Sequence, residues 1–490
     1  MTQVETPQSR CRFALSWGDI TPPANIYHRM WGAAKHERAT GVHRPLRATV
    51  AIFEAADAPT ARAGDLQSPS GTVSRQILLA LDHCIMGAVE HGQLVAHIAQ
   101  ATGESAGSIL VVFSHTHGAG LMGLERASLP GGDLIPSYLR DLAECAAALV
   151  NEAVAKLAPA DITYGNGRCN LAAHRDFWDE ERKLWACGFN PAGLADDTVL
   201  IARVTGTDGT LLASVVNYAC HPTTLAWDNT LISPDYIGAL REVVERETGV
   251  PCLFLQGANG ELGPVEGFVG DAAVADRNGR QLAYAALSAL TGLPAAGTRF
   301  RYTGPVVSGA TLGAWAHEPL PVDELAAKSA WHVARWNEPL PYRPGQPTAA
   351  QVETELKQFQ ADEDAARAAG DPAKAADCRA MAERKRRLLH RLSQLPRGEQ
   401  FPLQVTLWRM GDAFWLGVQG EFYSVLQTEL RRRFPGKAII VATIAADWGA
   451  SYLPPRELYG SGIYQETIAV VAPGSLEQVI EAVAQRMKIF

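Results

Sequence analysis

The sequence has no long hydrophobic run and no excess of positive charge, and its eight cysteines form no C-x-x-C pair. No stretch reaches the roughly 18 uninterrupted apolar residues that a transmembrane helix needs, so we expect no transmembrane segment. The formal net charge of −8 argues against a nucleic-acid partner, because nucleic-acid-binding proteins concentrate lysine and arginine on the contacting surface. Cysteines in apolar stretches are typical of reduced, buried thiols, and segment 1–10 lacks the apolar core of a signal peptide. We therefore expect a cytoplasmic protein.

The composition is otherwise that of an ordinary globular protein, with 47% hydrophobic and 20% charged residues. A chain of 490 residues forms two or three domains, or one large α/β domain with insertions. Apolar strand-like runs alternate with helical patterns, without internal repeats or a flexible linker, which favours the α/β class. The clearest strands are expected at 11–19, 48–53, 76–82, 162–169, 199–204, 211–218, 403–409, 414–418 and 438–443. The clearest helices are expected at 93–100, 139–157, 236–248, 277–290, 422–433 and 476–488.

Segment 348–395 differs in composition from the rest of the chain. Alanine, glutamate, lysine and arginine dominate it, with a helical period that Gly370-Asp371-Pro372 interrupts. We predict a helical hairpin inserted into the α/β domain. Its basic run 384–387 is more typical of a solvated helix face than of a nucleic-acid-binding patch.

The most informative stretch is 111–118, in which the apolar run Val-Val-Phe is followed by Ser-His-Thr-His-Gly. Residues i and i+2 of a strand point to the same side, so His115 and His117 share one face if the strand geometry continues. Histidine is the commonest metal ligand and the commonest general acid or base. A single His-X-His pair is nevertheless weak evidence for a metal site, because buried histidines also occur as ordinary core residues.

Further candidate ligands follow other predicted strands. His221 comes just after an apolar strand and is followed by Pro222, which cannot continue a strand ladder. Glu421 follows strand 414–418 and Gly420; it is either a favourable charge at a helix N-terminus or a ligand that completes a zinc site with two histidines. Asp235 is either a helix N-cap or a group that orients a histidine ligand.

These motifs together resemble the catalytic domain of the neutral/alkaline (non-lysosomal) ceramidases. The matching motifs stand in the order seen in that family: Asp-Ile-Thr-Pro-Pro at 19–23, Ser-His-Thr-His-Gly at 114–118, His-Pro-Thr at 221–223, Ile-Ser-Pro-Asp at 232–235, Gly-Glu-Phe at 420–422 and Tyr-Leu-Pro-Pro at 452–455. The resemblance implies that residues 1–490 form one large mixed-sheet catalytic domain, with the helical hairpin 348–395 inserted in it.

The resemblance also implies a ligand set and an activity. The zinc ligands of the family match His115, His221, Glu421 and Tyr452. His117 matches the histidine that lies against the substrate carbonyl oxygen, and Tyr464 matches a second residue that contacts the reacting group. The family hydrolyses the amide bond of N-acylsphingosine with Zn2+ as its metal.

Two positions depart from the family pattern. The family carries a serine in a Gly-Asp-X-Ser-Pro stretch, and the corresponding residue here is Gly263. An arginine that follows asparagine in the family is replaced by Leu171, for which Arg175 is a possible substitute. These differences question ceramide as the substrate more than they question metal-dependent hydrolysis.

We therefore predict a zinc-dependent amidohydrolase that acts on a small-molecule or lipid-like N-acyl substrate. A general base or leaving-group acid is required, for which His117 is the first candidate and Glu261 the second; Tyr464 is a candidate donor to the developing oxyanion. The alternatives are a zinc esterase, lactonase or small N-acyl amidohydrolase that does not act on ceramide, and a non-catalytic scaffold. The oligomeric state and the role of the hairpin stay open at this stage.

Overall fold

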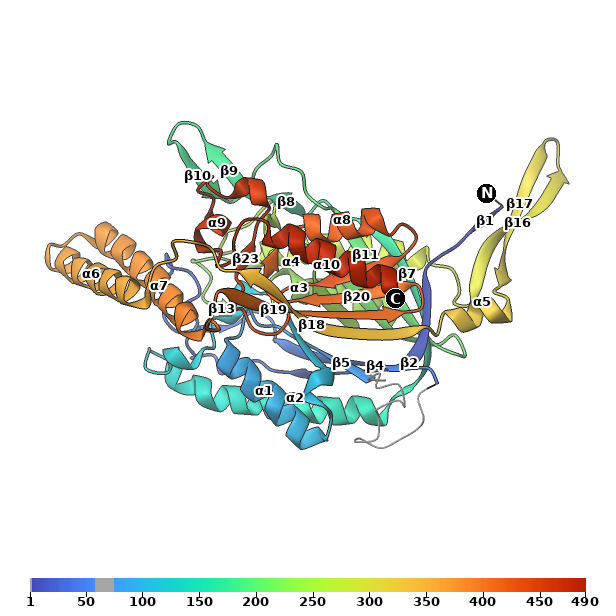
Figure 1. Ribbon diagram of the computed structural model, residues 1–490, viewed down its shortest axis with the longest axis horizontal. Coiled ribbons are helices and arrows are strands. Elements are labelled where there is room, and N and C mark those ends of the chain that lie inside the picture. The colour runs from blue at the N-terminus through green and yellow to red at the C-terminus, as the bar shows by residue number, and fades with distance from the viewer. Residues whose placement is uncertain (1, 58–74) are drawn as a thin grey trace.

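The computed structural model describes residues 2–57 and 75–490. Its largest element is an eight-stranded mixed sheet with the order β14-β12-β11-β7-β2-β4-β5-β6 (Figure 1). Neighbouring strands are antiparallel except at the two ends, where β12 with β14 and β5 with β6 are parallel. The strands are β2 (Gln8–Asp19), β4 (Arg47–Ala55), β5 (Arg75–Leu81), β6 (Ile109–Phe113), β7 (Ala158–Arg168), β11 (Thr198–Gly206), β12 (Leu211–Tyr218) and β14 (Cys252–Gln256).

Helices cover one face of this sheet. Side chains of β2, β4, β5 and β6 pack on α1 (Ala88–Thr102) and α2 (Ile135–Ala155). Side chains of β11, β12 and β14 pack on α3 (Tyr236–Thr248) and α4 (Ala272–Thr291). Because both faces are covered, these strands read as continuous apolar runs in the sequence.

A second sheet packs on the other face. It has the order β18-β19-β20-β22, with β18 (Trp331–Pro341), β19 (Gln400–Met410), β20 (Ala413–Val418) and β22 (Ala438–Ala442). Aromatic rings fill the interface: the ring of Phe53 lies 4.9 Å from that of Trp415 and 6.0 Å from that of Trp408, centroid to centroid. The outer face of this sheet is covered by α8 (Val425–Arg433) and α10 (Ser475–Ile489). The body therefore has four layers, helix, sheet, sheet and helix, and the predicted α/β class with a large mixed sheet is confirmed.

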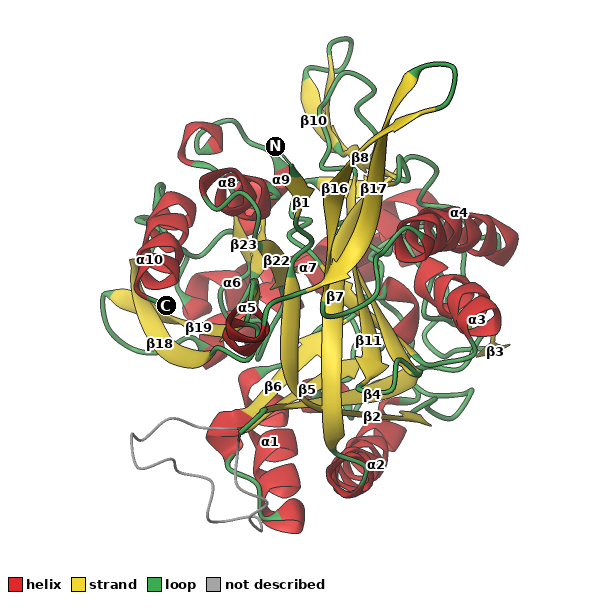
Figure 2. Cartoon of the chain, turned by 90° about the vertical axis from the view of Figure 1, so that its right-hand side faces the viewer, coloured by secondary structure: helices red, strands yellow, loops and turns green. Residues whose placement is uncertain are grey.

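Three pairs of elements project from this body in Figure 1: β9 (Asp176–Asp179) with β10 (Leu184–Cys187), β16 (Thr298–Val307) with β17 (Thr311–Pro319), and α6 (Ala349–Ala368) with α7 (Pro372–Gln394). Figure 2 shows the two strand pairs at the top, whereas α6 and α7 lie behind the body in that view. The helical pair α6–α7 lies within the predicted segment 348–395, and the interruption at Gly370-Asp371-Pro372 is the turn between the helices, with Asp371 capping α7. That this pair is an insertion into a family domain stays a prediction.

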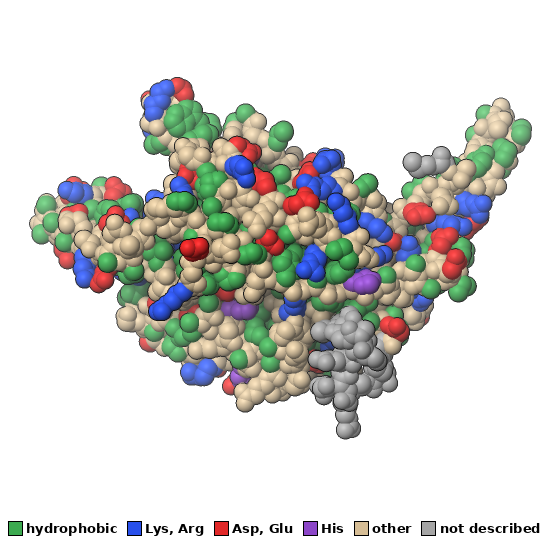
Figure 3. Space-filling model, viewed as in Figure 1, with side chains coloured by type: hydrophobic (Ala, Val, Ile, Leu, Met, Phe, Trp, Pro, Cys, Tyr) green, Lys and Arg blue, Asp and Glu red, His purple; other side chains and the backbone are tan. Residues whose placement is uncertain are grey.

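Short elements complete the chain. They are β1 (Gln3–Val4), β3 (Gly41–Val42), β8 (Ala172–His174), β13 (Leu231–Ile232), β15 (Leu262–Pro264), α5 (Val322–Ala327), β21 (Glu421–Phe422), β23 (Tyr452–Leu453) and α9 (Tyr464–Ile468). Three of them, β21, β23 and α9, contribute residues to the cavity described below. On the face shown in Figure 3, acidic and basic side chains are interspersed rather than gathered by sign. In the described part of the chain, no helix is long and apolar enough to cross a membrane.

Candidate metal centre and active-site cavity

The turn after β6 carries the two histidines of the His-X-His pair. The strand ends at Phe113, and the φ angle of +66° at His115 turns the chain away from extended geometry. His117 then begins a 3-10 turn, so the expectation that the two side chains share one strand face is wrong. The turn nevertheless keeps them together, with a distance of 4.9 Å between the ring centroids of His115 and His117.

The other three candidate ligands are positioned by short strands and loops. His221 lies beyond the end of β12, where its backbone N–H donates to the carbonyl of Leu262 at 3.0 Å. Glu421 and Tyr452 are directly paired residues of the parallel strands β21 and β23. Gly420 makes this pairing possible, because its φ is +95° and a Cβ there would lie 2.9 Å from the Cβ of Ala450.

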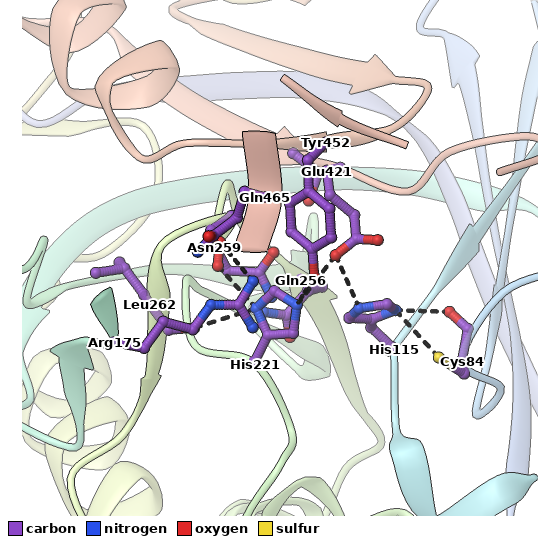
Figure 4. Close-up of polar contacts among 12 residues, drawn as sticks. Cys84, His115, Arg175, His221, Gln256, Asn259, Leu262, Glu421, Tyr452 and Gln465 are labelled. Atoms are coloured by element: carbon purple, nitrogen blue, oxygen red, sulfur yellow. Dashed lines mark hydrogen bonds and ion pairs between the residues drawn. The ribbon is translucent and has the colours of Figure 1, made fainter. Parts of the chain in front are cut away.

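These four side chains converge on one point (Figure 4). Glu421 Oε2 lies 3.0 Å from His221 Nε2 and 3.3 Å from His115 Nε2. The hydroxyl of Tyr452 lies 3.1 Å from His221 Nε2. All four residues are buried, and the ligand atoms of His115, His221 and Glu421 all lie within 4.8 Å of one another.

The hydrogen bonds of the two imidazoles leave electron pairs pointing at the same place. His115 Nδ1 lies 2.8 Å from the carbonyl oxygen of Cys84, and His221 Nδ1 lies 2.7 Å from that of Asn259. A carbonyl only accepts, so in the neutral rings Nδ1 carries the hydrogen and Nε2 presents a lone pair. Each Nε2 faces a carboxylate oxygen at hydrogen-bond distance, a contact that a proton on the nitrogen or a metal cation between the two atoms makes favourable. Two imidazole nitrogens with carboxylate and phenol oxygens form a donor set that suits zinc.

Burial shapes the charges of this cluster. Burial raises the pKa of Glu421, but the charge of His115 and hydrogen bonds from both histidines outweigh it and hold the pKa well below its usual range. Burial and the charge of Arg175 lower the pKa of His221 to about 3. Burial lowers the pKa of His115, but Cys84 and Glu421 outweigh it and raise that pKa well above its usual range. The cluster therefore combines a carboxylate that stays ionised with one imidazole, that of His221, that stays neutral.

Two supporting residues carry no signal that the sequence analysis used. Trp448 Nε1 donates to Glu421 Oε1 at 2.5 Å, which fixes the second carboxylate oxygen. The carbonyl oxygen of Cys84 accepts the hydrogen bond from His115 Nδ1, and the Sγ of Cys84 lies 3.5 Å from the same nitrogen. Trp448 begins a loop recognisable in the sequence, but a contact made by a backbone carbonyl such as that of Cys84 leaves no trace in residue identities.

His117 lies beside the cluster and lacks hydrogen-bond partners. Both ring nitrogens are buried, and neither is hydrogen-bonded to any described residue. The ring lies next to that of Trp31, with 5.1 Å between centroids and a tilt of 36° between the ring planes. Burial, and then the charges of His115 and His221, hold its pKa well below the usual range. Tyr464, at the start of α9, has its ring 5.9 Å from that of Tyr452 and lines the same cavity.

The carboxylates of Glu261 and Asp235 bind backbone N–H groups, and neither residue lines the cavity. Both carboxylate oxygens of Glu261 lie 2.9 Å from the backbone N–H of Ser424, whose hydroxyl also donates to them, and Glu261 is not among the residues that line the cavity. Burial raises the pKa of Glu261 to about 7. Asp235 caps α3 by accepting from the N–H of Tyr236 and also accepts from the N–H of Leu225, so of its two predicted roles the structure shows the cap.

The two positions that depart from the family pattern are both near the site. A Cβ on Gly263 would lie 3.7 Å from Thr223 Oγ1, so the backbone leaves room for a side chain that this sequence does not supply. Arg175 is buried and lies over the ring of Tyr452, 5.3 Å from its centroid, with one guanidinium nitrogen donating to the carbonyl of Gly260 at 2.6 Å. Leu171 is buried in the hydrophobic cluster under α3 and α4. A guanidinium thus does reach the site, from Arg175.

A cavity of about 940 Å³ opens onto the cluster. His115, His117, Glu421, Tyr452 and Tyr464 all line it. Helix α7 forms one wall, from Ala380 to Gln394, so the outer end of the helical pair projects while its inner end lies over the site. The basic run 384–387 is accordingly less open to solvent than predicted, because part of it faces this cavity.

Comparison with known proteins finds similarity in structure only. No family model matches the chain, and no curated protein has a significantly similar sequence. The crystal structure of neutral ceramidase from Pseudomonas aeruginosa is similar with a TM-score of 0.62 and 16% identity, over 98% of this chain and 74% of that one. A ceramidase structure described as complexed with C2 gives a TM-score of 0.61 and 17% identity, over 99% and 76% of the two chains. The resemblance is therefore confirmed at the level of the fold: the chain has the neutral ceramidase fold.

Proposed function

We propose that this protein is a zinc-dependent hydrolase that cleaves the amide bond of an N-acyl compound, with residues 1–490 acting as one catalytic domain. The observation that carries the proposal is the convergence of His115 Nε2, His221 Nε2, the Glu421 carboxylate and the Tyr452 hydroxyl on one buried point. The fold shared with neutral ceramidases supports the same reading. The eight free cysteines suit the cytoplasmic location that we include in the proposal.

Each residue has a role in this proposal. His115, His221, Glu421 and Tyr452 hold the zinc, which when bound lowers the pKa of water to roughly 7 and polarises a carbonyl. His117 is neutral, and its ring nitrogens have no hydrogen-bond partner among the described residues, so it can take a proton from the attacking water and pass it to the leaving amine. Tyr464 can donate its hydroxyl to the oxyanion that develops on the carbonyl oxygen. Glu261 is engaged with Ser424, which supports a role in holding the β21 turn rather than in proton transfer.

A second substrate class is favoured by Gly263. The family serine is absent, and the side chains nearest to the space at Gly263 are those of Thr223 and Arg175, so we keep an ester, lactone or small N-acyl compound as an alternative to ceramide. Hydrolysis rates for ceramide, short N-acyl amides and esters with one acyl chain, measured on the same preparation, separate these classes. Activity on esters alone would contradict the amide assignment.

Metal analysis tests the proposal most directly. We expect purified protein to contain about one zinc per chain, and removal of zinc by a chelator to abolish hydrolysis until zinc is restored. His221→Ala should lose the metal, whereas Thr224→Ala, a nearby buried residue outside the cluster, should keep it. A protein with no stoichiometric metal after loading would favour the scaffold alternative. Gel filtration of the same samples reports whether the protein forms an oligomer.

A further inference from the structure

The cationic side chains of α7 fall into two groups. Arg387 pairs with Glu383, and Lys385 pairs with Glu355. Arg384 and Arg391, which are seven positions apart on one helix face, also line the cavity but have different partners. Arg384 donates to the hydroxyl of Thr467 and Arg391 to that of Ser451, and within residues 2–57 and 75–490 neither forms an ion pair with a carboxylate.

Of the two arginines, Arg391 has the greater need of an anionic partner because its guanidinium is buried. Its exposed fraction is 8%, its Nη1 donates to Ser451 Oγ at 3.2 Å, and its Nε has no hydrogen-bond partner among the described residues. The guanidinium carbon lies 5.4 Å from the ring centroid of Trp448. Burial lowers its pKa to about 10, so it is still charged at neutral pH. The charge of Glu421 acts on Arg391 from beyond Trp448, but no described carboxylate pairs with the guanidinium directly. A buried charge without a direct partner is costly, and its retention beside a cavity indicates that a ligand supplies the anion.

The position of Arg391 relates that anion to the reaction centre. Trp448 lies between them: it contacts the guanidinium on one side and donates to Glu421 on the other. A different part of the cavity is aromatic, where Trp31, Trp227 and Phe268 pack with ring centroids 5.5 to 6.1 Å apart. Trp31 also contacts His117, so the aromatic group and Arg391 reach the metal cluster from the His117 side and the Glu421 side respectively.

We propose that the cavity takes an N-acyl compound whose amine portion carries a carboxylate, and that Arg391, assisted by Arg384, binds that carboxylate while the acyl chain lies on Trp31, Trp227 and Phe268. This inference rests on the proposed function. A planar guanidinium matches a carboxylate with two parallel hydrogen bonds, which is the recognition that arginine provides and lysine does not. The substrate would then be an anionic N-acyl compound rather than an uncharged sphingolipid.

The test uses three probes with one acyl chain: dodecanoylglycine, its uncharged counterpart dodecanoylethanolamine, and the acid dodecanoate. Hydrolysis of the two amides by the zinc-loaded enzyme gives kcat/KM for each. Binding of all three is measured by calorimetry in the His117→Ala protein, where turnover is expected to be lost. Both measurements are repeated with Arg391→Gln and with Lys374→Gln, an exposed residue of α7 that removes the same charge from the same helix.

We expect Arg391→Gln to weaken binding of dodecanoylglycine about 10-fold or more, to leave dodecanoylethanolamine nearly unchanged, and to lower kcat/KM only for the anionic amide. Lys374→Gln should alter none of these values by more than about twofold. The carboxylate of dodecanoylglycine could also bind to zinc, so only a loss of binding in Arg391→Gln assigns the carboxylate to Arg391. Binding of dodecanoylglycine that does not depend on Arg391 overturns the proposal, as does an effect confined to dodecanoate, which would assign the arginine to the product. Arg391-dependent binding without hydrolysis would keep the anion site and reject the proposed function.

Discussion

His115 and His221 are held in the same way although they lie on different loops. Each directs Nδ1 to a backbone carbonyl, at 2.8 Å and 2.7 Å, and each leaves Nε2 facing Glu421. His117 differs because neither of its ring nitrogens has a hydrogen-bond partner among the described residues. In the proposed function, this contrast separates the residues that would hold zinc from the residue that would carry a proton.

The first prediction follows from that contrast. His117→Ala should keep its zinc and lose about 100-fold or more in turnover, because the ligand set is intact while the proton carrier is gone. Metal content and kcat are measured on the same sample. If the variant held zinc and turned over like the wild type, the role assigned to His117 would be wrong.

The second prediction concerns Trp448. Trp448→Phe keeps the aromatic ring but removes the hydrogen bond to Glu421 Oε1, so zinc affinity should fall about 10- to 100-fold. Competition with a chelator of known affinity measures the change. Trp227→Phe is the matched control, since Trp227 lines the cavity without touching Glu421. Equal affinities in the two variants would show that the indole N–H does not support the carboxylate.

At the scale of residues, the sequence motifs identify the four side chains that converge in the structure but not the groups that hold them in place. His115, His221, Glu421 and Tyr452 can be found because each belongs to a motif of fixed spacing. The carbonyls of Cys84 and Asn259 could not be found, because every residue has a carbonyl and only the fold selects which one meets an imidazole. The burial of Arg391 could not be predicted for a related reason: an arginine on a highly charged helix is expected to face solvent, and only the fold shows that it is buried.

At the scale of elements, a buried ion pair holds the turn that leads from β5 toward His115. Asp82 accepts from Arg241 of α3 at 3.1 Å and from the backbone N–H of Arg47 at 2.9 Å. The backbone carbonyl of the next residue, His83, accepts a hydrogen bond from the backbone N–H of His115 at 2.9 Å. Helix α3 thereby supports the turn that carries both His83 and Cys84 to His115.

The third prediction tests this support. Arg241→Met removes the guanidinium but keeps much of the volume, leaving the Asp82 carboxylate buried and unpaired, so the free energy of unfolding should fall by about 3–5 kcal/mol. Urea denaturation followed by circular dichroism measures the change. Arg246→Met, in an exposed pair with Glu247, should cost less than about 1 kcal/mol. Similar losses in both variants would contradict a special role for the buried pair.

The fourth prediction concerns Glu383, which joins α7 to the body. Burial raises its pKa, but Arg387 and Arg126 outweigh this and bring the pKa to about 2, below the ordinary 4.5. A depressed folded-state pKa contributes stability above pH 4.5 that is lost as the pH falls toward 2. Wild type should therefore be more stable than Glu383→Gln by an amount that shrinks by about 3 kcal/mol between pH 6 and pH 2. Urea midpoints over this range measure the difference, and a difference independent of pH would contradict the ion-pair account.

Elements with a buried face are the ones that patterns predict well. Helix α3 has the predicted bounds, and β4, β12 and β20 are found within a few residues. The strands β16 and β17 were missed because their side chains are largely exposed, which removes the apolar alternation that marks a strand. Strand β18 was missed for the same reason, since little of it is fully buried.

At the scale of the whole molecule, the layered arrangement could not be derived from local patterns. That two sheets pack face to face depends on Phe53, Trp408 and Trp415, whose distances along the chain give no sign of their contact. The resemblance to a known family supplied what periodicity could not, namely the mixed sheet and the pairing of distant motifs. The fold similarity to neutral ceramidases bears out that part of the expectation.

The packing of the two sheets has a consequence for how the protein matures. His115 and His221 follow strands of the eight-stranded sheet, whereas Glu421 and Tyr452 follow strands of the four-stranded one. A chain with only one of the two sheets folded therefore holds only two of the four residues of the cluster. If the proposed function is correct, tight metal binding requires both sheets to dock first, so the metal would bind at the end of folding.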